Sequence, residues 1–256
     1  MSPLDVLAIL AAGLGAGTIN TIVGSGTLVT FPTLLFLGYP PLTANVSNNI
    51  GLVAGGVTGS WGYRRELAGQ SQALRRLMPL SFAGSVVGAG LLLVLPAAAF
   101  RAIVPVLILL ALVLVLVGPR IQAATAQSRA GGAVPRAHAW SMGIGVLVAG
   151  MYGGYFGAAQ GVLLMGLLSA LSSEPLQRLN GYKNVLSLVV NLVAAAMFVL
   201  FARSHIDWLV VLLIGTGSFL GGIIGARVGR RITPTLLRAL IVAIGVVAIV
   251  KLVWFP

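Results

Sequence analysis

Lys183 is a cationic side chain in an otherwise uncharged stretch of sequence. It lies in Asn180-Gly181-Tyr182-Lys183-Asn184, where an apolar run begins that continues to Phe201. A charged group within a membrane segment is costly, so it usually faces a cavity or a partner and marks a pathway. Because a buried cation favours an anionic ligand, Lys183 predicts an anion site.

Amide side chains accompany Lys183 at a spacing that places them on one helix face. Positions i, i+3 and i+4 are neighbours on a helix surface, and the sequence has this pattern twice. The first set is Asn45, Asn48 and Asn49; the second is Asn180, Lys183 and Asn184, extended by Ser187 and Asn191. Amides and one ammonium donate several hydrogen bonds to an oxyanion without a competing carboxylate. The alternatives are that these groups hold helices together, or that Lys183 snorkels to the interface.

Two glycine-rich breaks interrupt the apolar sequence. The first break is Val23-Gly24-Ser25-Gly26-Thr27, and the second break is Gly157-Ala158-Ala159-Gln160-Gly161. A short helix starting at each break would point its free N–H groups and the positive end of its dipole at an anion. Interrupted helices paired between two halves of a chain indicate a transporter site. The alternative is that the glycines serve only close helix packing.

We therefore predict a substrate site built from both breaks and both polar sets. Its residues are Gly24, Ser25, Gly26, Thr27, Asn45, Asn48, Asn49, Gly157, Ala158, Gln160, Gly161, Lys183 and Asn184.

Acidic and imidazole side chains are scarce. All of them lie in loops or at segment edges: Asp5, Glu66, Glu174, Asp207, His138 and His205. Without a buried carboxylate or imidazole, a cation transporter, a metal-dependent membrane enzyme and an intramembrane aspartyl protease are disfavoured. The chain has no cysteine, which excludes disulfides, thiol catalysis and thiolate metal sites. We expect no catalytic residue, metal or cofactor; a hydrolase using Ser187 and Lys183 is the remaining enzymatic alternative.

The elements that must position these residues are membrane helices. Of the 256 residues, 58% are hydrophobic and only 8% are charged, against about a quarter in a soluble domain, and the mean hydropathy is +1.05. The net charge of +12 does not indicate a nucleic-acid binder, because most arginines lie in short loops and no soluble segment is long enough for a basic face. The N-terminus lacks the basic region of a signal peptide, so we expect the first apolar segment to be retained.

The apolar segments fall into two similar halves. They run approximately 4–23, 26–38, 43–61, 77–95, 100–118, 139–156, 161–171, 181–202, 207–226 and 235–254. Each half has the order long, short, long, long, long. We therefore divide the chain into a first transmembrane repeat (1–118), a cytoplasmic linker (119–138) and a second transmembrane repeat (139–256).

Individual residues repeat along with the segments. Corresponding positions are Gly17 and Gly150, Gly24 and Gly157, Asn45 and Asn180, Asn48 and Lys183, Gly84-Ser85 and Gly217-Ser218, and Arg101 and Arg238. Five segments per half make the second half inverted relative to the first, as in many transporters. We predict an all-α integral membrane protein of two inverted repeats, with broken helices near the bilayer midplane. Chance similarity of glycine-rich apolar sequence is the alternative.

The arginines orient the chain in the membrane. If the loop 62–76 is cytoplasmic, alternation places Arg120, Arg129, Arg136, Arg178, Arg230 and Arg231 inside as well. Only Arg101, Arg203 and Lys251 then lie outside, in agreement with the positive-inside rule. Both termini face outward, whether segments 26–38 and 161–171 cross the membrane or form re-entrant hairpins.

At these residues the sequence resembles the TauE/SafE family of sulfite exporters and organosulfonate permeases. The similar stretches are Gly24-Ser25-Gly26-Thr27-Leu28 with Pro32, Pro40-Pro41-Leu42-Thr43-Ala44-Asn45-Val46-Ser47-Asn48, Gly154-Tyr155-Phe156-Gly157-Ala158, and Lys183-Asn184 through Asn191 to Phe198. The resemblance implies transport of sulfite, sulfonates or related sulfur oxyanions across the bacterial inner membrane. The second break contains less glycine than the family pattern, which puts equal ligand binding by both breaks in question.

The sequence thus predicts a secondary transporter of small sulfur-containing oxyanions that works by alternating access. An anion channel on the same scaffold and a non-transporting membrane scaffold protein are the alternatives. The expected partners are a small anionic substrate and the lipid bilayer but no nucleic acid, and a homodimer is compatible with the sequence. Direction of transport and coupling ion are not determined by it.

Overall fold

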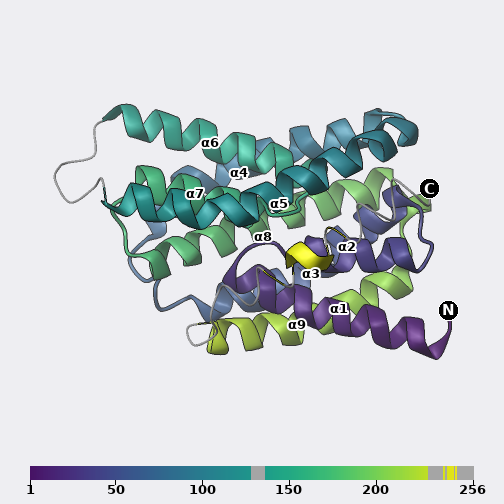
Figure 1. Ribbon diagram of the computed structural model, residues 1–256. Helices are drawn as coiled ribbons and strands as arrows, with labels where there is room; N and C mark the ends of the chain where they lie inside the picture. Colours follow the sequence, from purple (N-terminus) through teal and green to yellow (C-terminus); the bar gives the residue numbers. More distant parts are fainter. Residues whose placement is uncertain (128–135, 230–238, 240, 245, 247–256) are drawn as a thin grey trace.

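The fold consists of helices that lie side by side along a common direction (Figure 1). The computed structural model describes residues 1–127, 136–229, 239, 241–244 and 246, so most of the expected tenth segment, 235–254, lies outside the described residues. The helices are α1 (Pro3–Ile22), α2 (Thr27–Phe36), α3 (Pro41–Gly62), α4 (Ser71–Val94), α5 (Ala97–Gln127), α6 (Arg136–Tyr155), α7 (Gln160–Leu171), α8 (Leu176–Phe201), the 3-10 helix η1 (Arg203–His205) and α9 (Trp208–Val228).

Five of these helices, α1, α4, α5, α8 and α9, are long and apolar enough to cross a membrane. Helices α2 and α7 are apolar but shorter, as expected for the segments that follow the two breaks. The described residues form helices and turns without any strand. The prediction of an all-α membrane protein is therefore confirmed.

The helix ends follow local sequence signals. Ser2 and Asp5 form a reciprocal capping box at the start of α1, and the Asp207 carboxylate accepts hydrogen bonds from the N–H groups of Leu209 and Val210 at the start of α9. Such caps satisfy N–H groups that have no partner within the helix.

The region expected to be a linker is helical at both ends. Helix α5 continues through Pro119 to Gln127, and α6 already begins at Arg136. The residues after Pro119 are rich in alanine and glutamine, which favour helix. Helix α5 is therefore longer than the apolar segment that ends at residue 118. The expected linker 119–138 thus includes the end of α5 and the start of α6, and its residues 128–135 lie outside the described part of the chain.

The helices pack in two groups that meet at the contact between α3 and α8. Helix α9 packs against α1 and α3, while α4 packs against α6 and α8. The short helix α2 packs against α1 and α3, and α7 packs against α5, α6 and α8. The two breaks thus lie inside the bundle, each next to the helix that carries the polar set of its own half.

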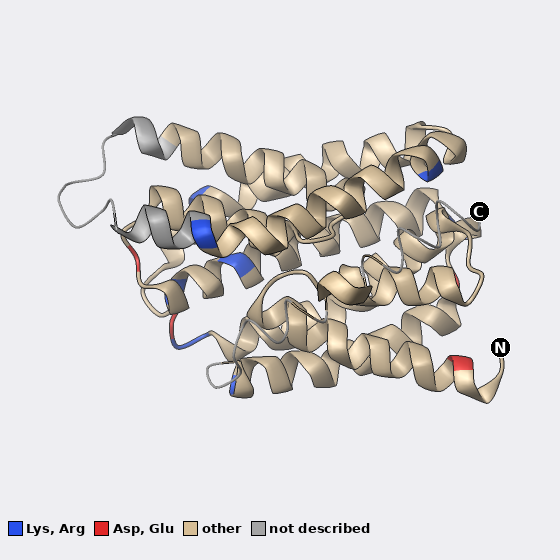
Figure 2. Cartoon of the chain, viewed as in Figure 1, with Lys and Arg blue, Asp and Glu red and all other residues tan. Residues whose placement is uncertain are grey.

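Basic residues gather toward one end of the molecule (Figure 2). This end is where α3 ends and α4 and α8 begin, and we call it the arginine-rich end. Its arginines include Arg64, Arg65, Arg75, Arg76, Arg178 and Arg227, whereas Arg101 and Arg203 lie at the opposite end.

Candidate functional site

Both breaks begin with the same helix-ending geometry. After α1, the N–H groups of Val23 and Gly24 both donate to the carbonyl of Ile19, at 2.7 and 3.1 Å. After α6, the N–H groups of Phe156 and Gly157 both donate to the carbonyl of Tyr152, at 2.9 and 3.2 Å. Gly24 has φ 89° and Gly157 has φ 77°, a region that glycine enters without steric cost. These glycines therefore end the helices.

The two breaks touch each other in the interior. The N–H of Gly161 donates to the carbonyl of Gly24 over 3.0 Å. A Cβ atom on either glycine would overlap the backbone of the other. The structure thus brings the predicted residues of the two breaks together, at a contact that leaves no room for a side chain.

The first break retains hydrogen-bond donors without a partner. No described residue accepts a hydrogen bond from the N–H groups of Ser25, Gly26 or Thr27, and α2 has no side-chain cap. The Ser25 hydroxyl is also buried without a hydrogen-bond partner. Buried donors without a partner are rare in proteins, so this cluster has room for an acceptor that the described residues do not supply. The start of α2 also carries the positive end of the helix dipole.

The second break leaves two backbone N–H groups, those of Ala158 and Ala159, without an acceptor among the described residues, one fewer than the first break. The N–H of Gln160 donates to the carbonyl of Gly157 over 3.3 Å, and the Gly161 N–H is used by Gly24. The Tyr152 hydroxyl donates to the carbonyl of Ala158 over 2.6 Å. The unpartnered side-chain atom here is Nε2 of Gln160, which is buried. The two breaks thus differ in their free donors.

The polar set of α3 connects the second break to α2. Asn45 donates from Nδ2 to the carbonyl of Tyr155 over 3.2 Å, at the end of α6. Asn48 accepts a short hydrogen bond from the Thr30 hydroxyl and donates to the Thr27 hydroxyl over 3.4 Å. Asn48 therefore fixes the first turn of α2.

Asn49 contacts the other polar set. Its Nδ2 donates to Oδ1 of Asn191 in α8 over 3.5 Å. The side-chain oxygens of Asn45 and Asn49 are buried without a hydrogen-bond partner, so each amide keeps an acceptor that is not used by the described residues.

Lys183 is fully buried and binds the last turn of α1. Its Nζ donates to the carbonyls of Asn20 and Thr21 over 3.0 and 2.9 Å. Asn184 donates to the Thr21 carbonyl over 3.3 Å, and Asn180 does so over 3.4 Å. The carbonyl end of a helix is the negative end of its dipole, where cations are stabilising. Lys183 therefore does not snorkel to the surface in this structure.

The polar sets of α3 and α8 thus both donate hydrogen bonds to backbone carbonyls at the end of a helix in the other half. Asn45 binds the end of α6, and Asn180, Lys183 and Asn184 bind the end of α1. Sequence reasoning missed their acceptors, Thr21 and Tyr155, because backbone carbonyls leave no sequence signal.

Ser187 and Lys183 do not form a nucleophile and base pair. Lys183 donates to the carbonyls of Asn20 and Thr21, and the Ser187 hydroxyl is without a partner among the described residues. Activation of a serine requires a base within hydrogen-bond reach. This arrangement gives no support to a Ser–Lys hydrolase.

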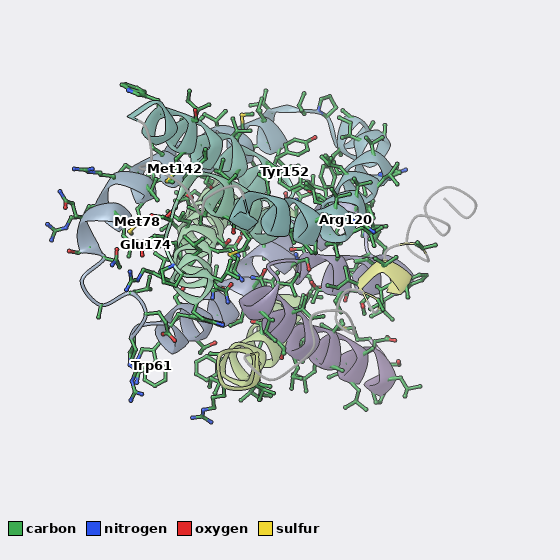
Figure 3. All side chains as sticks on the ribbon, turned by 60° about the vertical axis from the view of Figure 1, so that its left-hand side comes forward. Trp61, Met78, Arg120, Met142, Tyr152 and Glu174 are labelled. Carbon is green, nitrogen blue, oxygen red and sulfur yellow. The ribbon has the colours of Figure 1, made fainter. Side chains whose placement is uncertain are left out.

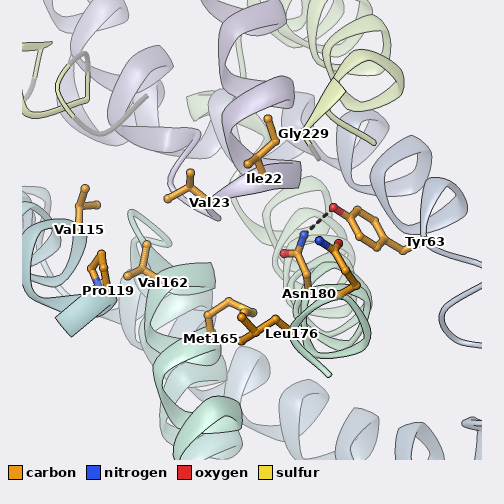
Figure 4. A pocket seen from close by; sticks show the side chains of 11 residues that line it. Ile22, Val23, Tyr63, Val115, Pro119, Val162, Met165, Leu176, Asn180 and Gly229 are labelled. Carbon is orange, nitrogen blue, oxygen red and sulfur yellow. Dashed lines mark hydrogen bonds between the residues drawn. The ribbon is translucent and has the colours of Figure 1, made fainter. Parts of the chain in front are cut away.

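A cavity of about 200 Å³ lies beside the first break (Figure 4). Ile22 and Val23 line it from the end of α1, and Asn180 lines it from α8. The Tyr63 hydroxyl lies 2.6 Å from Nδ2 of Asn180 at its wall. Because Tyr63 follows the end of α3 and Asn180 lies near the start of α8, the cavity lies toward the arginine-rich end.

The sequence model of the sulfite exporter TauE/SafE family matches residues 9–252. The chain belongs to this family. A probable membrane transporter protein of Haemophilus influenzae is 28% identical, over 98% of this chain and 96% of that relative. The probable membrane transporter protein ORF9 of a Sinorhizobium species is 28% identical over 94% and 89% of the two chains. YfcA of Escherichia coli K12, also a probable membrane transporter protein, is 26% identical over 99% and 91%.

No solved structure matches the chain significantly. The family match, the relatives and the five apolar helices together identify a multi-pass membrane protein of a transporter family.

Proposed function

We propose that this protein is a secondary transporter of small sulfur-containing oxyanions, sulfite or organosulfonates, and not an enzyme. The observation that carries the proposal is the cluster of free donors at the start of α2, formed by the N–H groups of Ser25, Gly26 and Thr27 and the Ser25 hydroxyl. Three backbone N–H groups at a helix N-terminus suit the oxygens of a compact oxyanion. The family name points to the same chemistry.

Lys183 would supply the positive charge of this site. An ammonium has three N–H donors, and the carbonyls of Asn20 and Thr21 use two of them. The third donor would bind the anion. Among the predicted site residues, Gly24 and Gly161 would then form the contact between the breaks, whereas Ser25, Gly26 and Thr27 would bind the anion. The amides Asn45, Asn48, Asn49 and Asn184 and the residues Gly157, Ala158 and Gln160 would line or support it.

Two inverted repeats would carry the site, and matched contacts support them. Helix α1 packs on α9 as α6 packs on α4, and α3 packs on α9 as α8 packs on α4. Ser218 of α9 donates to the carbonyl of Gly51 in α3 over 2.9 Å, and Ser85 of α4 donates to that of Val190 in α8 over 2.8 Å. Ser85 and Ser218 are the corresponding serines of the two halves, and each donates to a backbone carbonyl of the corresponding helix in the other half, as expected for halves related by a pseudo-two-fold axis.

Alternating access would move the two helix groups about the contact between α3 and α8. The cavity beside Val23 and Asn180 would be the opening on one side of the membrane, and the pair Tyr63 and Asn180 would close it. The broken helices would meet near the bilayer midplane, where rocking of one group against the other exposes the same site to each side in turn.

The distribution of charges supports one orientation in the membrane. The arginine-rich end would be cytoplasmic by the positive-inside rule, which places the N-terminus outside. The relatives come from bacteria, and the bacterial inner membrane is the expected location.

Flux in proteoliposomes tests the function. Purified protein should exchange or release sulfite or an organosulfonate at a saturable rate, with competition between these anions and none from a cation of similar size. A large, non-saturating anion current would favour a channel instead. Stable, folded protein without any anion flux or binding would favour a scaffold and refute the proposal.

A further inference from the structure

A groove runs along the outer face of the contact between α3 and α9, at a distance from the breaks. Its middle part encloses about 570 Å³ between Val53, Ala54, Leu212, Gly215 and other apolar residues of the two helices. Several lining side chains, among them Leu212, Phe219 and Leu220, are exposed. In a membrane protein such a surface faces the acyl chains of lipid.

A basic pocket lies one helical turn further along the same two helices, at the arginine-rich end. One turn beyond Ala54 and Phe219, a cavity of about 350 Å³ is lined by residues of α3, α9 and the turn after α3: Thr58, Trp61, Gly62, Arg64, Arg65, Ile223, Ala226 and Arg227. None of its three arginines forms a salt bridge with an acid in the part of the chain that the structure describes. These three arginines therefore line one pocket without a salt bridge to an acid among the described residues.

The Arg64 side chain is already held in place. Its guanidinium lies 3.8 Å from the centroid of the Trp61 ring, and Nη1 donates to the Trp61 carbonyl over 3.1 Å. Trp61 lies at the periphery of the molecule (Figure 3). Tryptophan is enriched at the level of lipid headgroups, which places this pocket at the membrane–water interface.

We propose that the groove between α3 and α9 binds one anionic phospholipid. Its phosphate would lie among Arg64, Arg65 and Arg227, and one acyl chain would follow the apolar groove past Gly215. From Ile50 to Gly62 the helix rises about 18 Å at 1.5 Å per residue, which exceeds the roughly 15 Å depth of one hydrocarbon leaflet. Basic pockets between membrane helices bind anionic headgroups. The apolar groove thus matches an acyl chain in length, and the basic pocket matches the charge of an anionic headgroup.

Lipid-dependent stability and native mass spectrometry test this site without any transport assay. The wild-type protein in detergent should retain 1-palmitoyl-2-oleoyl-phosphatidylglycerol and be stabilised by it more than by the matching phosphatidylcholine. A triple substitution Arg64→Gln, Arg65→Gln and Arg227→Gln should weaken phosphatidylglycerol binding about a hundredfold, at about fivefold per arginine. The pair Arg75→Gln and Arg76→Gln is the matched control, because both arginines are exposed at the same end but line neither cavity.

A substitution in the groove tests the acyl chain separately. The nearest heavy atom to a Cβ on Gly215 would be the Gly51 carbonyl oxygen at 3.8 Å, so Gly215→Leu should fold. It should weaken binding of the long-chain lipid but not of dihexanoyl-phosphatidylglycerol. The proposal is overturned if inorganic phosphate protects as well as the lipid, if phosphatidylcholine binds equally, or if the groove variant abolishes a dimer and leaves lipid binding unchanged.

Discussion

The backbone N–H of Gly161 donates a 3.0 Å hydrogen bond to the carbonyl of Gly24, so the two breaks are joined directly. No side chain takes part in this contact, and its strength depends on how closely the two backbones approach. The contact holds the start of α7 against the end of α1 and thereby sets the position of the free donors at the start of α2.

A methyl group at Gly161 should separate the breaks. In Gly161→Ala the new Cβ would overlap the backbone of Gly24, and overpacking of this kind typically costs about 1–3 kcal/mol. We expect a lower midpoint of thermal unfolding in detergent and reduced anion flux. Gly166→Ala in the same helix is the control, because no heavy atom lies within 4 Å of its Cβ position. Equal stability of the two variants would contradict the importance of the contact.

Replacing Lys183 by methionine should both destabilise the protein and weaken anion binding. The substitution keeps the apolar volume but removes the Lys183 donor from the carbonyls of Asn20 and Thr21, of which only Thr21 keeps other donors, Asn180 and Asn184. A hydrogen bond to a charged group contributes about 1.5–3 kcal/mol. We expect a lower unfolding midpoint, and a smaller stabilisation by sulfite than in the wild type. If the variant is less stable but binds sulfite with unchanged affinity, Lys183 only holds the end of α1 and does not bind the anion.

Removing the Ser25 hydroxyl should weaken ligand binding without lowering the stability of the folded protein. Because this hydroxyl is buried without a partner, Ser25→Ala should leave the free energy of unfolding unchanged or raise it. If the hydroxyl binds the anion, KM for sulfite should rise about tenfold or more. Ser169→Ala is the matched control, since its hydroxyl is also buried and unpartnered but lies near the other end of α7. A similar KM in both variants would exclude Ser25 from the site.

Two exposed glycines at opposite ends of the molecule provide a test of its orientation in the membrane. Gly38 and Gly69 both have open space around the Cβ position, so a cysteine fits there at the cost of backbone strain from their positive φ, and the chain contains no cysteine. Single cysteines at these positions should react with a membrane-impermeant maleimide from opposite sides, Gly69→Cys from the cytoplasm and Gly38→Cys from outside. Labelling of both from one side would rule out the proposed orientation.

Local sequence was sufficient to predict the helices, the two breaks and the asymmetry of charge. Gly24 and Gly157 end their helices because they adopt positive φ, a preference that belongs to the residue itself. Long apolar segments become helices in a membrane because every backbone polar group must be satisfied within the segment. The polar residues of α3 and α8 were also recognised, since their spacing alone places them on one face.

Only the tertiary structure decided which groups these residues meet. Lys183 was expected to face an anion, yet two of its donors bind the carbonyls of Asn20 and Thr21, more than 160 residues away in sequence. Likewise, both breaks were predicted to contribute to the site, but only the structure shows that the Gly24 carbonyl accepts from the N–H of Gly161, whereas the Ser25 N–H and hydroxyl have no partner among the described residues. Backbone carbonyls and N–H groups are present at every residue, so no sequence pattern reveals which of them a distant side chain reaches. That choice depends on how the helices pack.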